Sequence, residues 1–185
     1  MNITRRTALI GLSAMVVPPA RAQTNPPQRG AAEFAELEQP VVLDIAPTTG
    51  NLKETVQKGQ QLIWRRKESP TDRVFQLSNI SVGLLRTETG GQLSMTFSCS
   101  ISSLGYMISD EAKLDIVART RGGAAIYSWN LGIPVKCADR NQTLPPRTHE
   151  VPKDIAANLF TNITSVEITE YRESNSPEQK IYRCG

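Results

Sequence analysis

Residue types able to carry out acid–base or nucleophilic chemistry are sparse in this sequence. It has one histidine, His149, which lies in the proline-rich stretch 145–150. Every Ser-His-Asp or Cys-His mechanism would have to use that residue, and its position beside prolines predicts a solvated loop. One histidine and three cysteines without a Cys-x-x-Cys pair supply no usual zinc ligand set. The glycine motifs that bind phosphates and dinucleotides are missing as well. The sequence therefore predicts no metal site and no cofactor.

Carboxylate pairs are the one catalytic device that the composition leaves open. Glycoside hydrolysis needs two Asp or Glu side chains that face each other across a cleft. Adjacent Asp110 and Glu111 would point to opposite faces of a strand, and so would Glu167 and Glu170, which are an odd number of residues apart. We interpret these acids as surface residues. A hydrolase whose site is assembled from sequence-distant carboxylates or His149 is kept as an alternative function.

The strongest binding feature is a tryptophan followed by a basic run. These residues are Trp64, Arg65, Arg66 and Lys67. An aromatic plate beside dense positive charge suits a protein partner or an anionic glycan. The competing interpretation places Trp64 on an inward face with Leu62, while the basic residues form a polar strand edge that deters strand addition. The alternation of residue types favours this second interpretation.

The first 22 residues have the pattern of an export signal peptide. Arg5 and Arg6 precede an apolar stretch over 8–17, and residues 20–22 form a small-x-small cleavage site. The segment around the paired arginines resembles the twin-arginine export signal, although Ala8 stands where that signal usually has a large apolar residue. Neither this stretch nor a later one reaches the ~20 apolar residues that span a bilayer. We expect a bacterial protein that is periplasmic or secreted and has no transmembrane segment when mature.

Loss of residues 1–22 changes the charge of the chain, because that segment holds three arginines and no acid. The 21 basic residues then fall to 18, which equals the number of acidic residues, so the mature chain has no formal net charge. A nucleic-acid partner would need a basic excess on the folded domain. The composition therefore predicts no nucleic-acid partner.

The mature chain divides into a leader and one domain. Residues 23–40 contain Pro26, Pro27 and Gly30 with little apolar periodicity, which predicts a flexible leader. The remaining residues 41–185 are enough to form a single hydrophobic core.

Most of this domain has the alternation typical of β-strands. The clearest case is 93–101, where five apolar residues alternate with serines and a threonine. A second alternation runs over 127–137, and Gly132 and Pro134 on its outer face predict an edge strand or a bend. Further strands are expected at 41–46, 61–67, 74–86, 113–120, 165–171 and 180–184.

Short helices and turns complete the expected fold. Segment 51–58 and the segment after Pro152 each place apolar residues four apart, which predicts two short helices. Glycine pairs at 90–91 and 122–123 predict hairpin turns. Many short strands without a βαβ rhythm indicate an all-β fold, namely an antiparallel β-sandwich, loosely immunoglobulin-like, with one or two short helices. A β-barrel is the alternative.

The three cysteines predict one disulfide. Cys99 lies in the middle of an expected strand among apolar residues, where a thiol behaves as a small hydrophobic group. Cys137 and Cys184 each end a strand, so we expect these two to form the bridge, as export would permit. The sequence leaves open whether Cys99 stays reduced or pairs with another chain.

These observations lead to the hypothesis of an exported, non-catalytic interaction module, such as a periplasmic accessory, an inhibitor or an immunity-type partner. Besides the hydrolase, a carrier of a small apolar ligand is a further alternative. An open strand edge would favour the interaction module. A cleft with converging carboxylates or His149 would favour the hydrolase, and an enclosed apolar cavity would favour the carrier.

Overall fold

The structure is a computed structural model that describes residues 33–47, 50–56, 59–101, 106–108, 111–137, 141–171 and 179–184. The predicted signal peptide and residues 23–32 of the predicted leader lie outside these ranges. The elements of the described chain are β1 (Glu33–Leu37), β2 (Val41–Asp44), β3 (Leu52–Glu54), β4 (Leu62–Arg66), β5 (Ser69–Arg86), β6 (Gly91–Ile101), β7 (Tyr106–Ile108), β8 (Glu111–Arg119), β9 (Ala125–Pro134), β10 (Gln142–Thr143), β11 (Arg147–Val151), α1 (Lys153–Asn162), β12 (Ser165–Glu170) and β13 (Gln179–Arg183).

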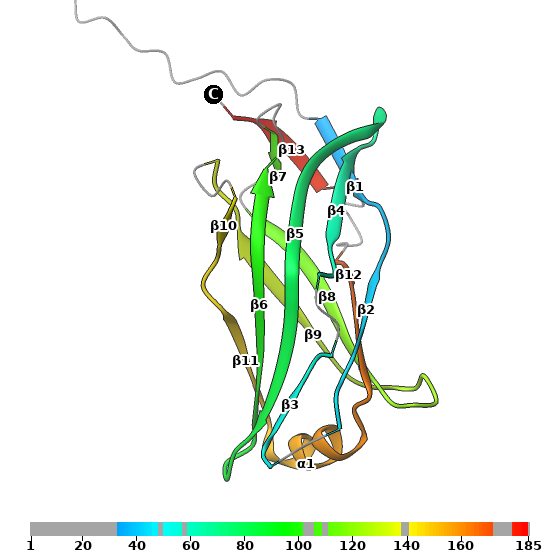
Figure 1. Ribbon diagram of the computed structural model, residues 1–185, viewed down its shortest axis with the longest axis vertical. Helices are drawn as coiled ribbons and strands as arrows, with labels where there is room; N and C mark the ends of the chain where they lie inside the picture. Colours follow the sequence, from blue (N-terminus) through cyan, green and yellow to red (C-terminus); the bar gives the residue numbers. More distant parts are fainter. Residues whose placement is uncertain are drawn as a thin grey trace, which may run out of the picture.

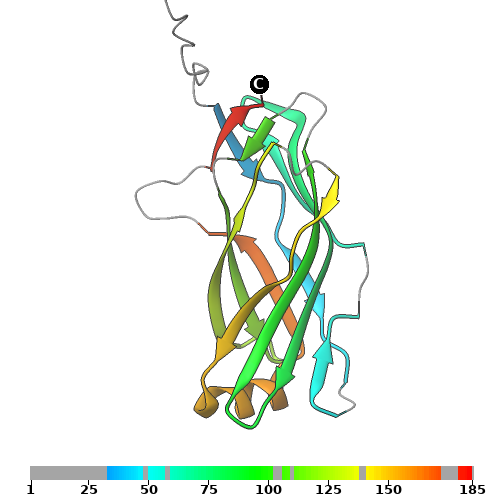
Figure 2. The ribbon, with the colours of Figure 1, turned by 90° about the vertical axis from the view of Figure 1, so that its left-hand side faces the viewer.

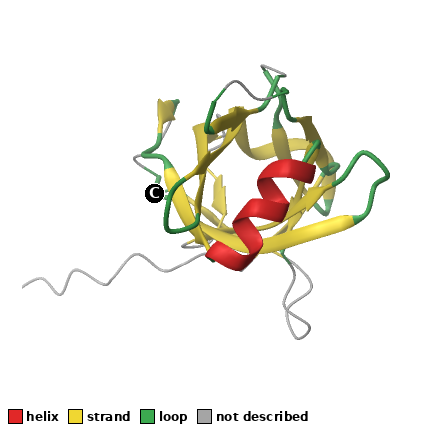
Figure 3. Cartoon of the chain, turned by 90° about the horizontal axis from the view of Figure 1, so that it is seen from below, coloured by secondary structure: helices red, strands yellow, loops and turns green. Residues whose placement is uncertain are grey.

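The strands form two antiparallel sheets that face each other (Figure 1). The larger sheet has the order β10-β6-β5-β4-β1-β13-β7, with β11 also paired to β6 and β3 also paired to β5. The smaller sheet has the order β2-β12-β8-β9. Seen from below, the larger sheet curls around the interior (Figure 3). The predicted all-β, sandwich-like fold is confirmed.

Alternating apolar residues fill the space between the sheets. In β6, every second residue from Leu93 to Ile101 is buried, as its sequence predicts. In β8, the buried residues are the even-numbered ones from 112 to 118. Each sheet therefore contributes one apolar face to a shared core. The largest fully buried side chains are Trp64, Phe75, Phe97, Leu43, Leu62, Leu77, Ile80, Leu84, Leu93, Met95 and Leu114.

Helix α1 lies across one end of the sandwich (Figure 3). It begins directly after Pro152 and buries Ala156 and Leu159 against the core. Asp154 in its first turn interacts favourably with the helix dipole. The helix expected after Pro152 is thus confirmed.

The second expected helix, over 51–58, is wrong for the part of that segment that the structure describes. Residues Leu52–Glu54 form strand β3, and Leu52 pairs with Leu85 of β5. A helix this short has few hydrogen bonds to offset the cost of its first turn. The backbone N–H and C=O groups of the long strand β5 instead provide hydrogen-bond partners for residues 52–54.

The expected leader also needs correction. Its residues Glu33–Leu37 form strand β1, which pairs with β4 on one side and β13 on the other. Ala35 is fully buried in this strand. The described domain therefore includes residues before position 41. The weak periodicity of this segment did not indicate a strand, whereas β4 and β13 provide the backbone hydrogen-bond partners that stabilise one.

The predicted disulfide between Cys137 and Cys184 is present, with a Cα–Cα distance of 5.7 Å. Cys137 follows a strand of the smaller sheet, and Cys184 follows a strand of the larger one. The bridge therefore ties chain segments from both sheets together. Cys99 lies outside the bridge and is buried on β6.

In the part of the chain that is described, no helix has the length and apolar character needed to cross a membrane.

Candidate functional site

Two edge strands, one from each sheet, meet along one side of the sandwich, the side that faces the viewer in Figure 2. Within the described residues, β9 pairs only with β8, and β11 pairs only with β6. Inward side chains of the two strands meet between them. We call this region the β9–β11 seam and define it by Tyr127, Trp129, Arg147 and His149.

The β9 side of the seam is aromatic. Tyr127 lies opposite Ala118 of β8 in the strand register, and Trp129 lies opposite Ile116. Both partners are fully buried, so the two aromatic side chains point inward as well. Their rings stack with centroids 6.0 Å apart. The inward direction of Tyr127 and Trp129 agrees with the sequence prediction that they belong to the core face.

His149 completes this aromatic cluster from the β11 side. Its Nε2 lies 2.7 Å from the Tyr127 hydroxyl oxygen, and its ring stacks on Trp129 with centroids 6.0 Å apart. The expected solvated loop is therefore wrong: His149 lies in a strand opposite Leu93 and is half-buried. The prolines that suggested a loop precede the strand, and β6 provides the hydrogen-bonding edge that orders the residues after them.

Burial in the seam affects the acidity of Tyr127. Partial removal from water disfavours the charged phenolate, so the pKa of Tyr127 is raised. The hydroxyl group of Tyr127 therefore stays protonated over the physiological pH range.

Arg147 lies two residues before His149, on the same inward side of β11. It faces Met95, which is buried, and is itself half-buried. Its Nε is shielded from solvent and has no hydrogen-bond partner among the described residues. Arg147 therefore brings to the seam a positive charge that no acidic side chain of the described residues neutralises.

The backbone edge of β9 is the other feature of the seam. This strand runs for ten residues, Ala125–Pro134, and contains no charged residue. Its pairing with β8 has one register shift, near Arg119. The sequence predicted an edge position for this strand from Gly132 and Pro134, and the position of β9 at the edge of the smaller sheet confirms it.

The residues of the predicted tryptophan-basic site have different surroundings, because Trp64 lies in the core whereas Arg65, Arg66 and Lys67 line a surface cleft of about 180 Å³. Trp64 is fully buried, and its Nε1 donates a hydrogen bond to the Glu170 carboxylate over 3.1 Å. Strand β4 pairs with β1 and with β5, so the expectation that this segment is a sheet edge is wrong. The inward direction of Trp64 alongside Leu62 is confirmed.

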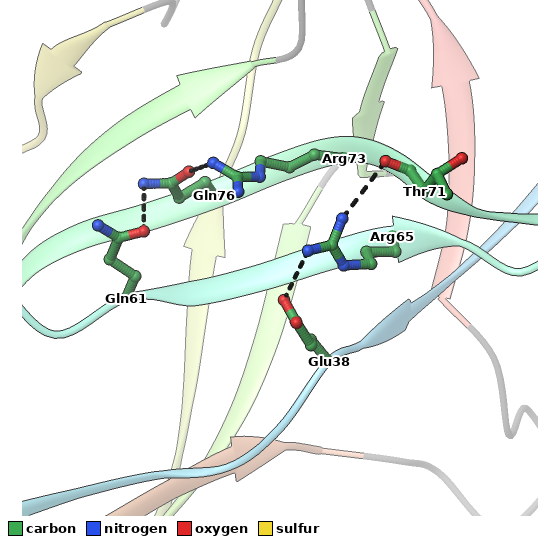
Figure 4. Close-up of polar contacts among 6 residues, drawn as sticks. All are labelled: Glu38, Gln61, Arg65, Thr71, Arg73 and Gln76. Atoms are coloured by element: carbon green, nitrogen blue, oxygen red, sulfur yellow. Dashed lines mark hydrogen bonds and ion pairs between the residues drawn. The ribbon is translucent and has the colours of Figure 1, made fainter.

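The three basic residues after Trp64 each lie beside an acid. Arg65 lies 3.1 Å from the Glu38 carboxylate and also donates to the Thr71 carbonyl oxygen (Figure 4). The other two ion pairs are Arg66–Asp72 at 3.7 Å and Lys67–Glu36 at 3.9 Å. These acids offset the local positive charge. Binding of a partner by the basic run stays a prediction.

The outer surface next to Arg65 is occupied by a chain of side-chain hydrogen bonds (Figure 4). Arg73 donates to the Gln76 side-chain oxygen over 3.2 Å, and Gln76 donates to the Gln61 side-chain oxygen over 3.0 Å. The polar side chains on this part of the β4–β5 surface therefore form hydrogen bonds with one another.

The carboxylates considered for catalysis do not converge where they are described. Glu167 points outward and pairs with Arg119 at 2.6 Å, whereas Glu170 is buried against Trp64. This confirms that the two acids face opposite sides of β12. Glu111 begins β8, and Asp110 lies outside the described residues. Within the described ranges, three or more His, Cys, Asp or Glu residues do not gather in a way that could hold a metal ion.

The described clefts lie at the surface and are lined by mixed charges. A cleft of about 440 Å³ beside the start of α1 is lined by Arg86, Glu88 and Lys153, among others. A second one, of about 220 Å³, lies near Glu111 and Lys113 on the smaller sheet. Neither cleft contains His149, and neither has the apolar, enclosed form that a carrier would use.

Comparisons with protein-family models, with curated proteins and with solved structures gave no match.

Sequence reasoning missed Arg147 and the partnership of His149 with the aromatic residues of β9. A local signal exists, because Arg147, His149 and Val151 alternate with Thr148 and Glu150 as a strand would. The contact across the seam has no local signal, because its two sides come from different sheets.

Proposed function

We propose that this chain is an exported, non-catalytic interaction module that binds an extended polypeptide segment by strand addition along β9. In this mode, the segment forms main-chain hydrogen bonds with an exposed strand edge, and alternate side chains of the segment contact the domain. The observation that carries the proposal is the ten-residue edge of β9, which lacks any charged residue.

The composition of β9 is unusual for an edge. Proteins protect edge strands from pairing with other chains by charged side chains, short length or a covering element. The other edges of the described sheets follow this rule: β2 carries Asp44, β3 carries Lys53 and Glu54, β10 has two residues and β7 has three. Within the described residues, β9 has Pro134 at its end as its only such feature.

Export is part of the same proposal. The disulfide is compatible with an oxidising compartment, where such bridges persist. The signal peptide and the periplasmic or secreted location are part of this proposal, and the sequence pattern alone supports them.

The proposal is tested with peptides selected from displayed random dodecapeptide libraries on the purified, disulfide-bonded protein. Binding of the selected peptides is then measured to a variant with two lysines on the exposed side of β9, Ser128→Lys with Asn130→Lys. Lysines on an edge strand hinder strand addition, so we expect the affinity to fall about tenfold or more, equivalent to at least ~1.4 kcal/mol.

The control variant, Ser165→Lys with Thr169→Lys, adds the same charge to β12, which has a paired strand on each side. It should bind the peptides as the unaltered protein does. Equal losses in both variants, or unchanged binding to the β9 variant, would contradict strand addition at β9.

A further inference from the structure

We infer that the β9–β11 seam selects a segment that carries a carboxylate, and that Arg147 is the residue that binds it. This inference rests on the proposed function, because it assigns the side-chain preference of the segment added to β9. The seam thereby supplies specificity, whereas the backbone edge of β9 supplies the main-chain hydrogen bonds.

Among the half-buried arginines of the described chain, Arg147 is the one that lacks an acidic partner. Arg65, Arg66 and Arg119 each lie within 4 Å of a carboxylate. Arg147 has no such ion pair in the described residues, and its Nε is shielded from water without an acceptor. Buried polar groups in folded proteins nearly always have a hydrogen-bond partner, so an exception points to a group supplied from outside.

The surroundings of Arg147 favour a charged acceptor. The guanidinium group binds a carboxylate through two parallel hydrogen bonds, which are stronger than hydrogen bonds between neutral groups. The stack of Trp129 on His149 and the buried Met95 place aromatic and apolar groups on the inward side of the seam, and the Nε of Arg147 is shielded from solvent. A partly desolvated environment strengthens the attraction between opposite charges.

The geometry of the seam also sets the pattern of the segment. Arg147 and His149 are two residues apart on one side of a strand, which corresponds to about 7 Å. Alternate side chains of an added strand repeat at the same spacing. One acidic group would therefore face Arg147, and the adjacent inward position would hold an apolar or aromatic side chain against the rings of Tyr127, Trp129 and His149.

The carboxylate has two possible sources, an Asp or Glu side chain and the C-terminus of the segment. Two displayed libraries distinguish them, one with the random peptide inside a longer chain and one with a free C-terminal carboxylate. Acidic residues enriched in the internal library indicate the side chain. Enrichment confined to the library with free C-termini indicates the terminal carboxylate.

Selected peptides are then compared with matched partners that lack the carboxylate, either Glu→Gln or a C-terminal amide. We expect the carboxylate form to bind the protein about tenfold more tightly, as charge-assisted hydrogen bonds allow. In the Arg147→Gln variant this preference should disappear. In the control Arg121→Gln, which removes an exposed arginine of the β8–β9 turn, the preference should remain tenfold.

The outcomes separate the two claims. Peptides that bind along β9 without a preference for the carboxylate, or whose preference survives Arg147→Gln, overturn the role of Arg147 and leave strand addition standing. Libraries that yield no peptide bound at β9 contradict strand addition and the inference that rests on it.

Discussion

At the residue scale, the contact between Tyr127 and His149 joins side chains from the two sheets. The Tyr127 hydroxyl group lies 2.7 Å from His149 Nε2, and both side chains are half-buried. A hydrogen bond of this kind contributes about 1 kcal/mol to stability. Because it joins the two edges of the seam, we assign it the role of holding β9 and β11 at a fixed separation.

The Tyr127→Phe variant should therefore lower the free energy of unfolding by about 1 kcal/mol at neutral pH. Urea denaturation followed by circular dichroism measures this change. Tyr171→Phe serves as the control, because Tyr171 lies outside the seam, on the outer side of the smaller sheet, and its replacement should change the free energy of unfolding by less than about 0.5 kcal/mol.

The same variant should alter the alkaline pH dependence of stability. Burial raises the pKa of Tyr127 above its usual value of 10.0, so the folded protein holds this proton more tightly than the unfolded chain does. Its contribution to stability is complete below pH 10 and is lost as the pH rises above that value. The stability difference between the unaltered protein and Tyr127→Phe should therefore narrow above pH 10; a constant difference would contradict this account. Burial lowers the pKa of Lys53, so its contribution to the pH dependence of stability has the opposite sign. Because Lys53 is present in both proteins, its contribution cancels in the comparison.

The sequence predicted the inward residues on the β9 side of the seam but not the contact made from the β11 side. The inward direction of Trp129 followed from alternation along its own strand, because a strand's two faces are set by residue spacing. The partner of His149 could not be predicted, because the contact depends on how the two sheets are placed. Trp64 shows the same division: its burial was predictable, and its hydrogen bond to Glu170, 106 residues away, was not.

At the element scale, the turn between β5 and β6 packs closely on the start of α1. A Cβ atom added at Gly90 would lie 2.5 Å from the carbonyl oxygen of Val151 and 3.5 Å from the backbone nitrogen of Lys153. Glycine at this position therefore allows the hairpin to contact the chain between β11 and the helix. This contact helps to fix the position of α1 at its end of the sandwich.

We expect Gly90→Ala to destabilise the protein by about 1–3 kcal/mol, because the backbone must shift to admit the methyl group. Gly122→Ala is the matched control in the next hairpin, since its Cβ would meet only Thr120 Oγ1 at 3.8 Å. Thermal unfolding of both variants tests this: equal midpoints for the two would show that the close approach at Gly90 has no energetic consequence.

At this scale, strands with a strong alternation of apolar and polar residues were predictable from the sequence. Strands that depend on pairing with neighbouring strands were not. β6 and β9 carry clear patterns in their own residues. β1 and β3 are short and weakly patterned, and they exist because β4 and β5 offer backbone partners. Local periodicity says little about such strands, since their stability comes from tertiary pairing.

At the scale of the whole molecule, the disulfide joins the two sheets near the C-terminus. It links positions separated by 47 residues in the sequence. Closing a loop of this length stabilises a fold by roughly 4 kcal/mol in the chain-entropy model. The pairing was predictable because Cys137 and Cys184 end strands, whereas Cys99 lies within the buried face of β6.

Cys184→Ser should accordingly lose roughly 4 kcal/mol of unfolding free energy under oxidising conditions. Adding reductant should destabilise the unaltered protein by a similar amount and leave the variant almost unchanged. A variant as stable as the oxidised parent would show that the bridge does not constrain the unfolded chain. A further large loss of stability in the reduced variant would indicate that another cysteine bridge had formed.

The central claim, that an extended segment adds to the edge of β9, is tested most directly by amide hydrogen exchange. The exchange rates of β9 amides are compared with and without a peptide selected from the displayed libraries, with β12 amides as the internal reference. Strand addition predicts that amides of Ala125–Pro134 that do not pair with β8 become protected, while β12 is unaffected. Protection confined to other strands, with β9 exchanging as in the unbound protein, would contradict the claim.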